Sequence, residues 1–160
     1  MEYQDFVTDV LYKNGFPICA YSSKKYNLKK GESTAHTEIK FDSKCTDTGN
    51  LYIETHERKN KGYAWVKSGI NRNDNSIFYF TGNYKKAWWF VKEQLKYLCE
   101  KKNKNGEFIF KRVQTPTSKG ILLPINYLEK HSLIPVKIFD FEKKGDIKKE
   151  NKTRTTTTKS

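Results

Sequence analysis

Residues 36–58 read HTEIKFDSKCTDTGNLYIETHER, and this stretch combines two strand patterns with a local excess of acids. Polar and apolar side chains alternate through residues 34–42 and again through residues 50–57, as in strands that bury one face. The residues between them, KCTDTG, have turn chemistry. The sequence therefore predicts that the two strands pair as a hairpin.

The acids of this stretch oppose the charge of the whole chain. The 160 residues carry 31 Lys and Arg against 18 Asp and Glu, a formal net charge of +13. Between Glu32 and Glu57, however, six acids stand against two bases. Such a basic chain favours a polyanionic partner, most often nucleic acid, although a lysine-rich surface can also serve solubility alone.

Strand alternation places Lys40 and Asp42 on one face of the first strand, and Glu54 and His56 on one face of the second. If the strands pair, either plausible register brings Asp42 within about 5–8 Å of Glu54, with Lys40 opposite or diagonal to Glu54. Two carboxylates at that distance can share a divalent cation such as Mg²⁺ or Mn²⁺. The alternative is an ordinary polar sheet face turned to solvent.

The remaining pattern predicts one α/β (α+β) domain over residues 1–141, in which helices flank a central mixed sheet. We expect helices at 2–13 and 85–101, the second carrying Trp88 on its buried stripe, and an irregular segment at 59–75. Further strands are expected at 16–23, 76–80, 107–113 and 134–141, with a strand leading into a short helix at 120–131. Residues 142–160 contain almost nothing apolar and are predicted to form a disordered basic tail.

Three widely spaced cysteines, Cys19, Cys45 and Cys99, indicate neither a disulfide framework nor a zinc ribbon. No apolar stretch approaches the roughly 20 residues that cross a bilayer, and the N-terminus lacks signal-peptide character. The sequence therefore predicts a soluble, cytoplasmic protein without a membrane partner.

The order of helix, strand, Asp-bearing hairpin and second helix resembles the PD-(D/E)XK nuclease superfamily, which has the restriction-endonuclease-like fold. The superfamily includes small phage endonucleases and junction resolvases, and the resemblance covers residues 1–100. It matches Asp42 to the first acid of the family and Glu54 to the second. It departs from the family pattern at His56, where a lysine is expected, and at Phe41, where a proline is expected.

This resemblance implies a metal-dependent endonuclease that hydrolyses phosphodiester bonds of DNA, with branched or phage DNA among its substrates. Asp42 and Glu54 would hold Mg²⁺ or Mn²⁺, and Lys40, or else His56, would orient the attacking water or take its proton. Because His56 replaces the family lysine, an inactive member of the fold is a second interpretation. The sequence leaves open the substrate structure and whether the chain forms a homodimer.

Basic residues outside the acidic stretch are candidates for contacts with the phosphate backbone. They are Lys24, Lys25, Lys29 and Lys30 in a basic loop, and Lys67 and Arg72 after the acidic strands. Two alternatives do not involve catalysis, and only the first of them uses the basic surface. One is a non-catalytic nucleic-acid-binding protein, and the other is a small interaction protein, such as a phage factor that binds a host enzyme.

Overall fold

The computed structural model describes residues 2–16, 37–132 and 134–143, and it has a mixed α/β architecture. This confirms the predicted α+β class, but the described strands form two four-stranded sheets and not one central sheet. The helical elements are α1 (Tyr3–Lys13), α3 (Cys45–Thr48), the 3₁₀ turn η2 (Gly69–Asn71), α4 (Lys92–Cys99) and α5 (Ile125–Lys130). The strands are β1 (Thr37–Phe41), β2 (Asn50–Glu57), β3 (Val66–Lys67), β4 (Phe78–Gly82), β5 (Lys86–Val91), β6 (Arg112–Gln114), β7 (Ser118–Pro124) and β8 (Lys137–Asp140).

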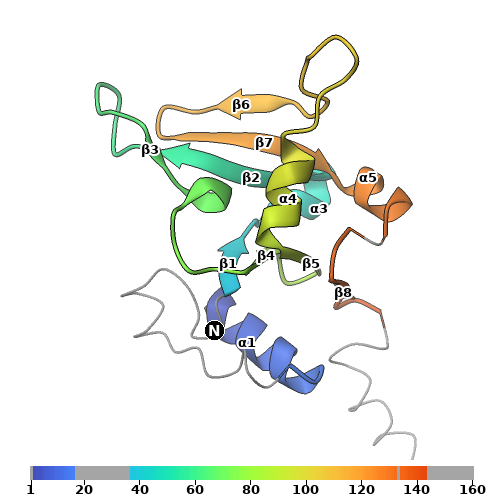
Figure 1. The fold of residues 1–160 in the computed structure, drawn as a ribbon. Helices are drawn as coiled ribbons and strands as arrows, with labels where there is room; N and C mark the ends of the chain where they lie inside the picture. Colours follow the sequence, from blue (N-terminus) through green and yellow to red (C-terminus); the bar gives the residue numbers. More distant parts are fainter. Residues whose placement is uncertain (1, 17–36, 133, 144–160) are drawn as a thin grey trace, which may run out of the picture.

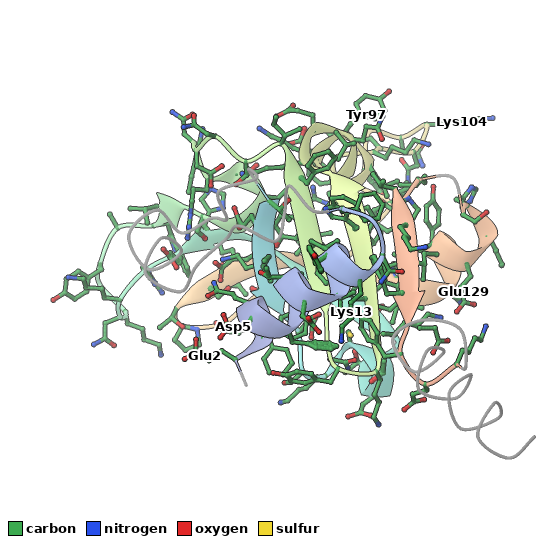
Figure 2. The ribbon with its side chains drawn as sticks, turned by 90° about the horizontal axis from the view of Figure 1, so that it is seen from below. Glu2, Asp5, Lys13, Tyr97, Lys104 and Glu129 are labelled. Carbon is green, nitrogen blue, oxygen red and sulfur yellow. The ribbon has the colours of Figure 1, made fainter. Side chains whose placement is uncertain are left out.

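The first sheet is mixed and has the strand order β1-β4-β5-β8. β1 runs parallel to β4, while the other two pairs are antiparallel. Helix α1 lies across one face of this sheet, as the view in Figure 2 shows. The helix buries one apolar stripe, which includes Val7, Val10 and Leu11, against Phe80 of β4 and Trp89 of β5. This contact fixes α1 where the sequence predicts a helix.

The second sheet is antiparallel and has the strand order β3-β2-β7-β6. Its apolar face contributes Leu51 and Ile53 to a core shared with the opposite face of the first sheet. Trp88 and Phe90 of β5 and Leu95 of α4 close this core. Figure 1 shows the resulting arrangement, with α1 and the second sheet on opposite sides of β4 and β5.

The helix predicted at residues 85–101 is wrong over its first half, which forms β5 before α4 begins at Lys92. Trp88 and Phe90 face one core, whereas Ala87 and Trp89 face the other. A strand that is buried on both faces has a continuous apolar run and no alternation. Such a run matched the spacing of a helical stripe, and this caused the error.

The hairpin predicted for residues 34–57 is also wrong. β1 pairs with β4 in the first sheet, and β2 pairs with β7 and β3 in the second. The residues between β1 and β2 form the short helix α3, which ends at Gly49 with a φ of 75°. This helical turn sends the chain from one sheet to the other, so Lys40 lies opposite Thr81 and not opposite Glu54.

The other predicted elements agree in part. β7 leading into α5 and β8 confirm the elements predicted at 120–131 and 134–141, and β4 confirms the strand near 76–80. The strand predicted at 107–113 begins only at Arg112. The predicted strand at 16–23, apart from Phe16, and residues 144–160 of the predicted tail lie outside the described residues. None of the described helices is long and apolar enough to cross a membrane.

Candidate functional site

A cavity of about 620 Å³ lies where the end of β1 meets the open edge of β2. Lys40 and Asp42 line it from the β1 side, and Tyr52 and Glu54 line it from β2. The structure thus brings together three of the four residues predicted for catalysis, although β1 and β2 do not pair. The residues that complete the lining are Phe41, Ser43, Lys44, Thr48, Asn50, Tyr79, Thr81 and Leu122.

Backbone amides hold the Asp42 carboxylate in place. Its Oδ2 atom accepts a hydrogen bond of 2.8 Å from the Tyr52 amide, on the edge of β2 that faces away from β7. Burial raises the pKa of Asp42, while hydrogen bonds from the amides of Tyr52, Lys44 and Cys45 oppose this rise. Asp42 therefore links the two sheets, and the Tyr52 residue that it contacts lies two strand positions, or roughly 7 Å, before Glu54 along β2.

Two serine hydroxyls hold the Glu54 carboxylate. Ser68 donates to Oε1 at 2.8 Å and Ser118 donates to Oε2 at 2.7 Å. Because the Ser118 hydroxyl donates its proton to Glu54, it accepts the hydrogen bond from the Tyr52 hydroxyl. Each carboxylate oxygen keeps a further lone pair, so Glu54 is oriented and can still bind a cation.

Two glycines make this arrangement possible. Gly69 has a φ of +52°, and a Cβ atom there would lie 2.2 Å from the carbonyl oxygen of Glu54. A Cβ atom at Gly120 would lie 2.4 Å from the ring of Tyr52. Any larger residue at either position would displace β2 or its side chains.

A buried network of charges reaches the cavity through Lys40. The Lys40 ammonium lies 3.5 Å from Glu38 Oε2, and the Lys92 ammonium lies 3.5 Å from Glu38 Oε1 and 3.0 Å from Asp74 Oδ1. The Glu38 side chain is almost fully buried, and burial raises its pKa, against the opposing effect of Lys40, Lys92 and Arg72. Burial also acts to raise the pKa of Asp74, but its hydrogen bonds, including that from Lys92, lower it overall. Glu38 thus positions the Lys40 ammonium, a role that the sequence did not reveal.

Two further hydroxyls in the cavity lining were missed from the sequence. Tyr79 and Thr81 of β4 are fully buried, and within the described part of the chain neither hydroxyl has a hydrogen-bond partner. Burial raises the pKa of Tyr79 well above its ordinary value, and the charges of Glu38, Glu54 and Asp42 add to this effect. In the sequence, Tyr79 reads as an ordinary core aromatic, so nothing indicated its position beside the carboxylates.

His56 does not share the cavity with Glu54. It lines a separate cavity of about 150 Å³ with Ile70 and Arg112, and its Nδ1 lies 3.0 Å from the Thr55 hydroxyl. The ladder between β2 and β7 shifts register between Glu54 and His56, so the predicted alternation ends at Thr55. The prediction that Glu54 and His56 occupy one face is therefore wrong.

The residues predicted to contact nucleic acid lie in different places. Lys67 is exposed on β3, and Arg72 is partly buried beside Glu38. Lys24, Lys25, Lys29 and Lys30 lie outside the described residues.

The donor set of the cavity suits a hard cation with water in its coordination sphere. The described residues contain no group of three or more His, Cys, Asp or Glu side chains that could hold a metal. Two carboxylates are nevertheless the usual protein contribution to a Mg²⁺ site that also binds phosphate oxygens. Asp42 and Glu54 therefore fit Mg²⁺ or Mn²⁺ better than a metal that needs a complete set of protein ligands.

Comparisons with family models, curated proteins and solved structures found no match to this chain.

Proposed function

We propose that this protein is a nuclease that hydrolyses phosphodiester bonds of DNA with the help of Mg²⁺ or Mn²⁺. One observation carries the proposal: in a chain of net charge +13, the carboxylates of Asp42 and Glu54 line one cavity and are each held by hydrogen bonds. Carboxylates that are held in place within a basic protein are suited to bind a divalent metal ion next to a phosphate group of DNA. The resemblance to PD-(D/E)XK nucleases supports the same function, which would be exercised in the cytoplasm.

In this proposal, Asp42 and Glu54 hold the cation. When bound, Mg²⁺ supplies electrostatic stabilisation of the phosphate and lowers the pKa of a water molecule. Ser68 and Ser118 keep Glu54 oriented, which preserves the spacing between the two carboxylates. Their hydroxyls therefore act through Glu54 and not on the substrate.

Lys40 is the proposed cationic contact for the scissile phosphate, because it lines the same cavity as the two acids. His56 is not proposed for this role, since it lines a different cavity.

A plasmid cleavage assay tests the function. Wild-type protein should nick or linearise plasmid DNA with Mg²⁺ or Mn²⁺ and should not do so in EDTA. Asp42→Asn and Glu54→Gln should each abolish cleavage, because they remove a charged ligand and keep the side-chain shape. Asp47→Asn, an exposed change on the neighbouring helix α3, is the matched control and should cleave as wild type. Cleavage by Asp42→Asn at the wild-type rate would contradict the proposal.

A nucleic-acid-binding protein without catalysis is the second candidate. It is favoured by the displacement of His56 and by the lack of a third acidic, His or Cys ligand among the described residues. This candidate predicts salt-sensitive DNA binding and no cleavage under any metal.

A further inference from the structure

The connection between β2 and β3, together with β3 itself, forms a projecting arm, which we define as residues 58–67 with the sequence RKNKGYAWVK. Figure 1 shows it at the left end of the second sheet, extending away from both cores. The arm contains four bases and no acid. The arm therefore carries a formal net charge of +4.

The base of the arm is braced against the neighbouring β6–β7 turn. The Arg58 guanidinium lies 4.1 Å from the centre of the Trp65 ring, and its Nε donates to the Pro116 carbonyl oxygen at 2.7 Å. The Arg58 amide also donates to the Thr117 carbonyl oxygen at 3.0 Å. Lys119 adds a second cation 4.6 Å from the Trp65 ring. These contacts use Arg58 and Trp65 to hold the arm in one conformation.

Apart from Arg58 and Trp65, the arm keeps its charges and apolar groups exposed. Lys59, Lys61 and Lys67 are exposed, and none forms an ion pair with another described residue. The Tyr63 ring is 58% exposed and Val66 is 54% exposed. A braced element that directs lysines and an aromatic ring into solvent has the composition of a nucleic-acid contact.

The base of the arm lies near the cavity. It begins four residues after Glu54 on the same strand, a distance of roughly 13 Å along β2. Its brace Lys119 is adjacent in sequence to Ser118, which donates to Glu54. DNA held by the arm would therefore pass near the two carboxylates.

We propose that the arm binds the sugar–phosphate backbone of duplex DNA, with Lys59, Lys61 and Lys67 neutralising phosphates and the Tyr63 ring packing in a groove. The identity of the ligand rests on the proposed function. A duplex fits better than a single strand, because single-strand sites stack successive bases on several rings and the arm exposes only Tyr63.

The test is fluorescence anisotropy with a labelled duplex in EDTA, measured across a series of salt concentrations. The magnitude of the slope of log association constant against log salt concentration should fall by about 0.9 for each phosphate that the protein no longer neutralises. The triple variant Lys59→Ala/Lys61→Ala/Lys67→Ala should therefore reduce it by about 2.7. The matched control, Lys101→Ala/Lys104→Ala/Lys130→Ala, also removes three exposed lysines. Lys104 lies on the opposite side of the molecule from the arm in Figure 2. The control should change the slope by less than one. Equal slopes for the two triple variants would overturn the proposal.

A second variant tests the aromatic contact without changing charge. Tyr63→Ala should weaken duplex binding and leave the salt slope unchanged, because the slope counts phosphates. Wild-type affinity in this variant would overturn the groove contact.

The binding assay needs neither metal nor cleavage, so the two proposals can fail separately. An arm-dependent slope in a protein that never cleaves DNA would support the arm and refute the nuclease. Metal-dependent cleavage with equal slopes for both triple variants would refute only the arm.

Discussion

The hydroxyl of Tyr79 offers a sharp test of the cavity, because it can be compared with the hydroxyl of Tyr52 in the same lining. Tyr79→Phe removes a buried hydroxyl that has no partner among the described residues. Relieving an unsatisfied buried polar group should stabilise the fold by about 1–3 kcal/mol. Tyr52→Phe instead removes a hydroxyl that is bonded to Ser118, and it should cost about 1 kcal/mol.

Thermal unfolding without metal measures both changes. For a chain of this size, 1 kcal/mol shifts Tm by about 2–4 °C, so Tyr79→Phe should raise Tm by at least that amount and Tyr52→Phe should lower it. A Tm that falls equally in both variants would refute this interpretation of Tyr79.

Three further predictions concern the charge network, the close packing and the DNA partner. Burial raises the pKa of Glu38, so the ionised carboxylate lowers the free energy of unfolding at neutral pH. Protonation of Glu38 restores this free energy as the pH falls toward the ordinary pKa of 4.5. The free energy of unfolding of wild type relative to Glu38→Gln should therefore rise as the pH is lowered from 7 through this window, and a flat difference would contradict it. Gly69→Ala should lower the free energy of unfolding by about 1–3 kcal/mol in urea titrations, because the new Cβ would meet the Glu54 carbonyl, and unchanged stability would refute this. DNA affinity in EDTA should fall at least about tenfold between 50 and 200 mM salt, and salt-independent binding would remove the nucleic-acid interpretation.

The sequence predicted three residues that line the cavity, but it did not predict the strand connections that form the cavity. Asp42 and Glu54 were selected by local charge and by strand alternation, and neither property depends on which strand pairs with β1 or β2. The pairing of β1 with β4 depends instead on contacts between residues some 40 positions apart. Local turn chemistry suggested a hairpin, but the same residues form α3, and a local pattern cannot distinguish the two outcomes.

His56 and Tyr79 show why the rest of the site was not predictable. A register shift at Thr55 moves His56 to another cavity, and such a shift depends on the partner strand β7. Tyr79 lies in a strand that is buried on both faces, so its sequence context does not distinguish it from other core aromatic residues.

The central claim is that Asp42 and Glu54 hold one divalent cation, and titration of Mn²⁺ followed by electron paramagnetic resonance tests it most directly. Binding suppresses the signal of free Mn²⁺, so bound metal is counted without any reference to activity. We predict one Mn²⁺ per wild-type chain, the same for Asp47→Asn, and a large loss of affinity for Asp42→Asn. Equal Mn²⁺ binding by wild type and Asp42→Asn, or no binding by either, would contradict the claim.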